Sequence, residues 1–389
     1  MCTIESLPSV DALLVSPRRL WDVPWTAYCS EFETVLAELL GAETVDIERG
    51  EGRLERALAP RFRARNAAAR WTPVQAFSWQ RPPRRHELAV IVVNDLRQLG
   101  VLAALRSWRS VATVFVAYVY EVWPAWLPTA SQVVDEVVDQ LDHVFVGIRT
   151  GADALRAMTS TPVSFVPPAV DVLAVQPAVT SDARRIDVSN RGRRDLQQHQ
   201  VLRAWAQRTG RYYEFDTLHN ATVVDPFEHR RHYYEQIARS RAFVANPARF
   251  DLPELSAGAD EVGLRYLEAL ACGTVLVGDH RPGSPIRRVL DGAPGMLVLP
   301  TGAGALGVEL EDLLGDDAVL HELGAANRAV ALGRHDVVHR WETMSIALGV
   351  GPLRGAERRR AALRSAAGEA GGAVTAQART AIASRSAAR

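Results

Sequence analysis

Apolar residues recur along this chain in two patterns that alternate with each other. Uninterrupted runs at residues 88–93 and 112–119 predict strands that are buried on both faces. Residues 25–40 instead carry apolar side chains at a helical spacing, and Gly41 is a typical residue to end a helix. Strands that alternate with helices in this way predict an α/β protein with a doubly wound parallel sheet.

The same alternation continues to about residue 348 and predicts two series of elements. The first series has further strands at 11–16, 43–47, 143–147 and 163–166, helices at 48–70 and 152–158, a helix that runs to residue 108, and a loop at 73–85. The second series has strands at 186–189, 212–215, 242–245, 274–277 and 296–299, helices at 197–208 and 229–239, and three amphipathic helices at 305–348.

A change in composition separates the two series. Residues 167–182 are rich in proline, alanine and valine without periodicity, which is typical of an interdomain linker. We therefore predict one Rossmann-like domain at residues 1–172 and a second at residues 173–350, whose last helix could cross back to the first. Large apolar residues are almost absent from residues 351–389, so we expect an Ala/Arg-rich tail that is disordered or only partly helical.

Composition limits the class of protein. The chain has 389 residues, 48% of them apolar, and as many acidic as basic residues, which is typical of a globular protein of two domains. No run approaches the roughly 18 consecutive apolar residues of a membrane span. The N-terminus lacks the basic and apolar regions of a signal peptide, so we expect a cytoplasmic protein without a transmembrane segment. The three cysteines do not have the spacing of metal ligands.

The basic residues are unusual because all 45 of them are arginine. Any cation that binds a phosphate group must therefore be an arginine or a histidine. From residue 352 onward, eight arginines stand against two glutamates, a surplus of six, so the preceding body carries six more negative than positive charges. This balance argues against a nucleic-acid-binding core, and we expect no nucleic-acid partner.

Residues 260–279, DEVGLRYLEALACGTVLVGD, have the most informative pattern in the chain. The apolar residues Leu264, Leu267 and Leu270 share one face of a predicted helix. Gly273 then ends the helix, and a short buried strand follows. On these grounds alone the segment could be an ordinary helix–strand unit with solvated acids at its start.

The acidic residues of this segment point to a ligand. Asp260 comes just before the helix and Glu268 lies eight residues further on, which is roughly 12 Å along the helix axis. The unpaired N–H groups and the positive dipole end of a helix start suit a phosphate. A carboxylate two turns along can accept hydrogen bonds from hydroxyls, such as those of a ribose. The layout therefore fits a nucleoside diphosphate whose sugar lies along the helix.

The string GLRYLEALACGT resembles the donor-site signature of retaining GT-B glycosyltransferases of the family-4 type. It is most similar to the glycosyltransferase-like domain of spore-coat maturation proteins and their bacterial relatives. The segments NDLRQL, SWRSVATVFVAYVYEVWP, DHVFVGIRTGADAL and VPPAVD resemble the acceptor-side domain of the same group. The resemblance implies a GT-B fold with two Rossmann-like domains that face a cleft. It also implies a hexosyl-type transferase whose co-substrate is a nucleotide sugar of the UDP or GDP type, with no other cofactor.

The resemblance also implies roles for single residues. Glu268 would hold the ribose hydroxyls. Asp260 stands where the family usually has a glutamate, so either Asp260 or its neighbour Glu261 could face the donor sugar. The backbone at the start of the helix would face the diphosphate and the donor sugar, at Val262, Gly263 and Leu264.

An arginine-rich turn follows the predicted strand at residues 186–189. A Gly-Arg pair at this place contacts the diphosphate in the family, which implies this role for Gly192 with Arg193 or Arg194. The family usually has a lysine about five residues further on, whereas this chain has Gln198 and His199 there. One arginine could still make a bidentate phosphate contact alone. The alternative is an exposed run of charge.

Three further residues have two interpretations each. Glu121 follows a predicted strand, where it could face a substrate cleft or could only cap the strand next to Trp123. His229 and His232 lie three residues apart on a predicted helix and could be mistaken for metal ligands. Because they are flanked by arginines and lack a third ligand, we interpret them as part of a solvated face and predict no metal site.

We therefore predict a glycosyltransferase that holds a nucleotide sugar on its second domain and receives an acceptor from its first. The acceptor could be a glycan, a metabolite or a protein. The candidate catalytic residues are Asp260, Glu261 and Glu121. Catalysis would come from arginines and helix-start N–H groups that stabilise the departing diphosphate, without a metal. The resemblance implies retention at the anomeric carbon. Two alternatives remain open: a GT-B-shaped binding module that transfers nothing, and a nucleotide-sugar epimerase.

Overall fold

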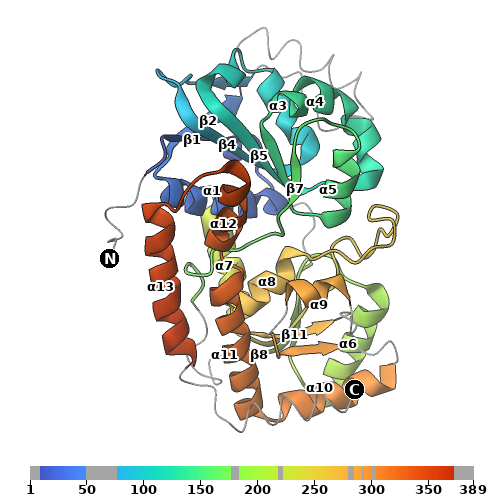
Figure 1. Cartoon of the computed structure of the whole chain (residues 1–389). Coiled ribbons are helices and arrows are strands. Elements are labelled where there is room, and N and C mark those ends of the chain that lie inside the picture. Colours follow the sequence, from blue (N-terminus) through green and yellow to red (C-terminus); the bar gives the residue numbers. More distant parts are fainter. Residues whose placement is uncertain are drawn as a thin grey trace.

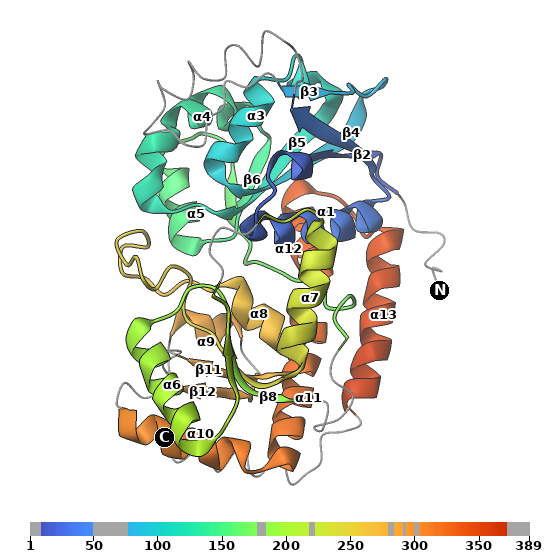
Figure 2. The ribbon, with the colours of Figure 1, turned by 180° about the vertical axis from the view of Figure 1, so that it is seen from behind.

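The computed structural model describes residues 9–49, 77–176, 184–217, 222–278, 284–290, 293–298 and 303–371. Its strands form two separate sheets, one in each half of the chain. Figures 1 and 2 show each sheet with its own helices, in two domains that meet end to end. Within the described ranges, no helix combines the length and the hydrophobicity needed to cross a bilayer.

The first domain is built on a seven-stranded sheet in the order β3-β2-β1-β4-β5-β6-β7. Every neighbouring pair is parallel except β2 with β3. The strands are β1 Ala12–Ser16, β2 Glu43–Arg49, β3 Phe77–Trp79, β4 His86–Asp95, β5 Ala112–Glu121, β6 His143–Val146 and β7 Val163–Phe165. The helices are α1 Ala27–Leu40, α3 Gly100–Ala103, α4 Ser131–Glu136 and α5 Arg149–Arg156, with 3₁₀ turns η2 Arg18–Leu20, η3 Pro24–Thr26, η4 Leu96–Leu99, η5 Trp108–Val111, η6 Pro124–Ala130 and η7 Val138–Gln140.

The central strand β4 explains why the apolar run LAVIVV is uninterrupted. Its side chains alternate between two apolar clusters, with Val90 and Val92 in one and Ala89 and Ile91 in the other. Helix α1 covers the first of these faces. Because both faces of a parallel sheet are covered, a central strand needs an apolar residue at every position.

The second domain has a five-stranded parallel sheet in the order β12-β11-β10-β8-β9. The strands are β8 Ile186–Asn190, β9 Tyr213–Phe215, β10 Ser240–Val244, β11 Val275–Gly278 and β12 Met296–Val298. The helices are α6 Leu196–Thr209, α7 Pro226–Ala238, α8 Leu264–Ala271, α9 Pro285–Val289, α10 Ala303–Leu314 and α11 Asp317–Arg334. The predicted α/β class, with two doubly wound sheets, is confirmed.

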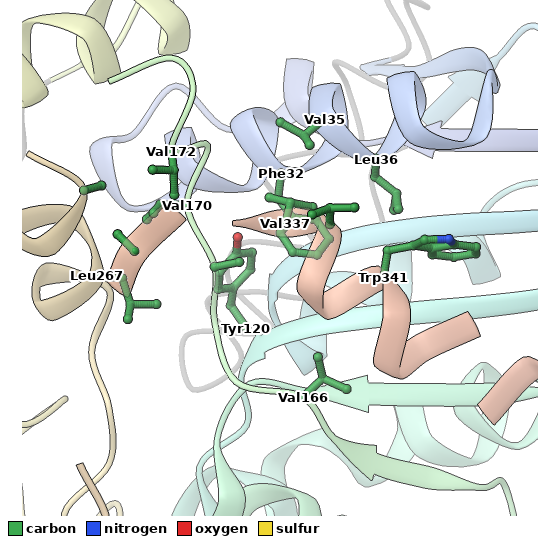
Figure 3. Close-up of a cluster of buried hydrophobic side chains, with 14 of the residues drawn as sticks. Phe32, Val35, Leu36, Tyr120, Val166, Val170, Val172, Leu267, Val337 and Trp341 are labelled. Atoms are coloured by element: carbon green, nitrogen blue, oxygen red, sulfur yellow. The ribbon is translucent and has the colours of Figure 1, made fainter. Parts of the chain in front are cut away.

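The two domains share one apolar cluster where the chain crosses between them. This cluster contains Phe32 of α1, Val170 of the linker and Leu267 of α8 (Figure 3). After α11 the chain returns to the first domain as α12, Val337–Leu348, which packs on α1. Trp341 of α12 is only 2% exposed in the same cluster. The helix that follows the second domain in the chain therefore packs on the first domain.

Of the tail at residues 351–389, which we expect to be disordered or only partly helical, Arg354–Gly371 form helix α13 and pack against α11 and α1 (Figure 1). The docked face is made by buried Ala356 and Leu363. Arg359 donates to Asp336 from Nε at 2.7 Å and is also paired with Asp171 of the linker. Composition alone did not predict this docking. A few regularly placed apolar residues and the ion pair of Arg359 with Asp336 are enough to hold the helix on the body. Residues 372–389 lie outside the described residues.

Two predictions for the first domain also need correction. Phe77–Trp79 lie in the predicted loop at residues 73–85, yet they form the edge strand β3. Three residues are too few for periodicity to reveal a strand. Of the predicted helix at residues 48–70, the first two residues end β2 instead, and the rest lies outside the described residues.

Candidate functional site

Helix α8 begins at the edge where the second sheet faces the first domain. Gly263 precedes it in an extended conformation (φ −88°, ψ 156°) and has no side chain that could cap the helix start. Val262 is buried, whereas Gly263 and Leu264 are half-buried. The helix ends at Ala271, and Cys272 and then Gly273, with φ 62°, follow it. The first backbone N–H groups of a helix have no partner within the helix and can receive an anion.

The carboxylate of Glu268 lies only about one turn into α8, rather than the two turns expected from the sequence, because the helix begins at Leu264, and it is only 3% exposed. Its Oε1 accepts from Nη1 of Arg230 at 2.5 Å, and its Oε2 accepts from the Tyr233 hydroxyl at 3.0 Å. Both partners belong to α7. Arg230 is buried like Glu268, whereas Tyr233 is half-buried. Tyr233 is therefore the more exposed of the two residues that bind Glu268.

Arg230 is held from the other domain as well. Its Nε donates to Glu31 of α1 at 2.8 Å, and Tyr234 of α7 donates to the same carboxylate at 2.8 Å. The backbone N–H of Asp171 in the linker also donates to Glu31, at 2.8 Å. Burial alone would lower the pKa of Arg230, but Glu31, Tyr234 and Glu268 more than offset this and raise it. The arginine is thus firmly charged and joins both domains.

The two acids before α8 have different surroundings. Glu261 is 5% exposed and reaches across to the first domain, where it caps helix α5. It accepts from the backbone N–H groups of Arg149 (3.2 Å) and Thr150 (2.8 Å) and from the Thr150 hydroxyl (2.8 Å). Asp260 is exposed, and its contact with the Ser284 hydroxyl is 3.3 Å. Of the two, only Asp260 is available to a ligand.

Glu121 ends β5 and forms a second contact between the domains. It accepts from Nη2 of Arg249 at 2.7 Å and from the Trp123 indole at 2.9 Å. Arg249 follows β10 and has a left-handed backbone (φ 55°), which is uncommon for an arginine. Glu121 therefore binds the Trp123 indole within its own domain, and it also forms an ion pair with Arg249 of the other domain.

The Gly192–Arg194 turn lies next to the start of α8. Gly192 has φ +74°, and a Cβ there would overlap the guanidinium of Arg265, the second residue of α8. Arg193 pairs with Asp251 at 2.6 Å, and its carbonyl accepts from Arg265 at 3.4 Å. Arg194 instead pairs with Asp216 at the edge of the sheet. The structure therefore brings Gly192 and Arg193 to the helix start and turns Arg194 away from it.

Sequence reasoning missed four residues of this site: Arg265, Arg230, Tyr233 and Glu31. Arg265 could have been found, because it lies inside the recognised motif in a chain whose phosphate ligands must be arginines. The sequence around Arg230 did not indicate a site, because the neighbouring His229 and His232 predict a solvated face. His232 does lie on that face, exposed between Glu228 and Glu235. Among the described residues, no group of acidic, histidine or cysteine side chains could hold a metal ion.

Cys272 does not serve as a nucleophile in this arrangement. Its side chain is fully buried between α8 and α7, and burial raises the pKa of its thiol to about 12. His229 is half-buried, and burial followed by the nearby Arg230 lowers its pKa. Neither the Cys272 thiol nor the His229 imidazole therefore carries a charge in this site near neutral pH.

Comparison with known proteins identifies the fold. Residues 191–345 match the model of a family described as glycosyl transferase-like, and no curated protein matches the chain. One similar solved structure is an alpha-glucosyltransferase in complex with UDP-glucose and DNA containing an abasic site. Its TM-score is 0.54 at 10% identity, over 88% of this chain and 99% of that one.

A second similar structure is an alpha-glucosyltransferase in complex with UDP and a 13-mer DNA containing a HMU base. Its TM-score is 0.52 at 10% identity, over 87% of this chain and 98% of that one. At such low identity the similarity establishes the fold. The resemblance to GT-B glycosyltransferases is confirmed in fold, and in sequence for the second domain.

Proposed function

We propose that this chain, which has the GT-B fold and a second domain that matches a glycosyl transferase-like family, transfers a sugar from a nucleoside diphosphate to an acceptor. One observation carries the proposal. Arg193 and Arg265 meet at the start of α8, where the N-cap residue is a glycine, and Glu268 lies further along the same helix. The arginines and the N–H groups of the helix start suit a diphosphate, and the carboxylate further along the helix suits the ribose attached to it.

The diphosphate would bind at the start of α8. Backbone N–H groups after Gly263 and the positive end of the helix dipole favour its charge. Arg265 and Arg193 would complete the site, and Arg193 would exchange its contact with Asp251 for a phosphate oxygen. Preorganised cations at the position where negative charge develops lower the barrier to departure of the diphosphate. The proposal requires no metal ion, since these groups supply the neutralising charge.

The ribose would bind through Glu268. Oε1 of this residue would keep its contact with Arg230, while a ribose hydroxyl would take the place of the Tyr233 hydroxyl on Oε2. The exchange conserves the number of hydrogen bonds on the carboxylate. It requires only that the half-buried tyrosine rotates away, because the buried arginine can stay in place.

The donor sugar and the acceptor would meet between the two domains. Asp260 rather than Glu261 would face the sugar hydroxyls, because Glu261 already caps α5. Glu121 would act from the acceptor side, at the carboxyl end of β5, where ligands bind in open α/β sheets. Retention at the anomeric carbon is part of the proposal on the strength of the family resemblance.

UDP is the first nucleotide to test, because both similar structures contain UDP or UDP-glucose. They also contain DNA, so the absence of a nucleic-acid partner stays a prediction from charge alone. A binding module without transfer is the second candidate, since Glu121, Glu261 and Glu268 are all engaged by partners within the chain. Such contacts are also what a donor-free enzyme would form.

A donor-turnover assay tests the proposal. The protein is incubated with UDP-, GDP- and dTDP-sugars, and the release of nucleoside diphosphate is followed. We expect slow hydrolysis of one donor, abolished in Glu268→Ala and retained in Glu235→Ala, which removes an exposed carboxylate of α7. A changed sugar would indicate an epimerase, and binding without turnover would indicate a binding module. If no nucleotide or nucleotide sugar bound at all, the proposal would be wrong.

A further inference from the structure

One buried arginine is bound by carboxylates from both domains. Arg230 donates through Nε to Glu31 of α1 and through Nη1 to Glu268 of α8. The side chains of Arg230 and Glu31 are each 8% exposed, and that of Glu268 is 3% exposed. Tyr234 closes the group because its hydroxyl donates to Glu31 and accepts from Arg230. Four side chains from three helices thus form one buried polar network.

The charges in this network do not cancel. Two carboxylates face one guanidinium, so a net negative charge is left on the group. A buried charge is stable only when hydrogen bonds compensate it. Glu31 receives such bonds from Tyr234 and from the backbone N–H of Asp171, whereas the outer oxygen of Glu268 receives only the Tyr233 hydroxyl among the contacts described here. Glu268 is therefore the member that can take up a further hydroxyl donor.

We propose that Glu31, in the first domain, is a positioning residue for the nucleotide that binds the second. It anchors Arg230, and Arg230 fixes one oxygen of Glu268 so that the other is directed to the ribose. This inference rests on the proposed function, because it assigns a second residue to the same ribose site. It adds that this site is complete only when both domains are in contact.

The geometry explains why the anchor matters. While Nε of Arg230 is bound to Glu31, only its Nη1 reaches Glu268. Without Glu31, Arg230 would be free to turn its planar guanidinium edge-on and bind both oxygens of Glu268, as arginine and carboxylate prefer. The oxygen assigned to the ribose would then be occupied. Loss of Glu31 should therefore weaken nucleotide binding although Glu31 does not touch the nucleotide.

A double-mutant cycle on the full chain tests this inference. The dissociation constants of UDP, GDP and dTDP are first measured for the wild type, and the tightest of the three becomes the probe. It is then titrated into Glu31→Gln, Glu268→Gln and the double variant. If Glu31 acts through Glu268, Glu31→Gln alone should raise the dissociation constant of the nucleotide by about tenfold. When it is added to Glu268→Gln, it should raise the constant by less than about twofold.

Glu33→Gln is the matched control, because Glu33 is also a buried glutamate of α1. Burial raises its pKa to about 8, and its partner is the Ser16 hydroxyl rather than Arg230. This change should leave the dissociation constant unaltered. Tyr234→Phe supplies a second route into the network should Glu31→Gln not fold. It removes one anchor of the arginine and should weaken binding by about threefold, again only while Glu268 is present.

The outcomes separate the two proposals. Equal losses with and without Glu268, or no loss in Glu31→Gln, would overturn the role of Glu31 while the nucleotide site itself stands. A wild type that binds none of the three nucleotides, or a Glu268→Gln variant that binds as tightly as the wild type, would overturn the proposed function and this inference with it.

Discussion

Glu31 and Glu268 lie in different domains and bind the same guanidinium, that of Arg230. This relationship places the carboxylate assigned to the ribose at the boundary between the domains. Two further carboxylates cross the same boundary: Glu261, which caps α5, and Glu121, which pairs with Arg249. Each of these acids already has partners within the chain, so we expect a ligand that enters here to replace existing contacts.

Removal of the Tyr233 hydroxyl should favour the nucleotide. In the structure this hydroxyl donates to the oxygen of Glu268 that we assign to the ribose. Tyr233→Phe should therefore tighten UDP binding by about threefold, because the competing hydrogen bond is gone. Calorimetric titration measures the change, and Tyr212→Phe, an exposed tyrosine of the same domain, is the control. Weaker binding in Tyr233→Phe would mean that the tyrosine itself contacts the nucleotide.

Two glycines with the same φ angle allow the cost of backbone strain to be measured separately from an effect on nucleotide binding. Gly192 and Gly210 both have φ +74°, but a Cβ meets the Arg265 guanidinium at Gly192 and open space at Gly210. Each change to alanine should cost about 1 kcal/mol of unfolding free energy, because alanine disfavours this angle. Only Gly192→Ala should also weaken UDP binding, since it displaces Arg265. Denaturant unfolding and titration of both variants check this, and equal nucleotide affinities would exclude Arg265 from the diphosphate site.

Glu33 should make stability depend on pH. Burial raises its pKa from 4.5 to about 8, even though the Ser16 hydroxyl donates to it at 2.6 Å. Between those two values the folded chain keeps a proton that the unfolded chain releases, so stability is fully present below pH 4.5 and falls as the pH rises towards 8. The loss relative to Glu33→Gln should approach about 1.4 kcal/mol per pH unit at most. Urea unfolding of both proteins at pH 5, 6, 7 and 8 measures it.

A difference between the two proteins that did not change with pH would contradict this account of Glu33. The glutamine variant should be the more stable of the two at pH 8, because it removes a carboxylate that becomes charged without a cationic partner among the hydrogen bonds described here. Its side-chain oxygen can still accept from Ser16, so packing is preserved.

Arg359 should hold the last helix on the body. It donates to Asp336 at 2.7 and 2.8 Å, and Asp336 is fully buried. Arg359→Leu should cost about 3 kcal/mol, because it leaves a buried carboxylate without its cation. The neighbouring Arg358 is exposed, and Arg358→Leu should stay within about 0.5 kcal/mol of the wild type. Equal stability of the two variants would show that α13 does not contribute to the folded body.

The periodic pattern predicted most of the fold because central strands and long helices have unambiguous apolar spacing. Residues 88–93 fall inside β4, and residues 25–40 enclose α1. Edge strand β3 and the docking of helix α13 on the body were not predicted, because the stability of both comes from neighbours. β3 has three residues paired with β2, and α13 depends on an ion pair with a distant aspartate. Neither interaction leaves a periodic signal in the sequence.

The candidate site could be predicted from the sequence only where its residues belong to one continuous segment. The motif at residues 260–268 predicted a helix, which begins at Leu264, and the structure brings the turn at Gly192 beside it. The sequence could not distinguish Asp260 from Glu261, because what separates them is α5, whose backbone N–H groups engage Glu261 from the other domain. The partners of Glu268 come from α7 and, through Arg230, from α1, more than 200 residues away in the chain.

Comparison of UDP with 2′,3′-dideoxy-UDP, each titrated into the wild type and into Glu268→Ala, tests the central claim most directly. If Glu268 binds the ribose hydroxyls, loss of those hydroxyls should weaken binding to the wild type by about tenfold or more and should have little effect on the variant. If the wild type and Glu268→Ala lost the same affinity, or if the wild type bound both nucleotides equally, Glu268 would not be the ribose ligand and the account would be contradicted.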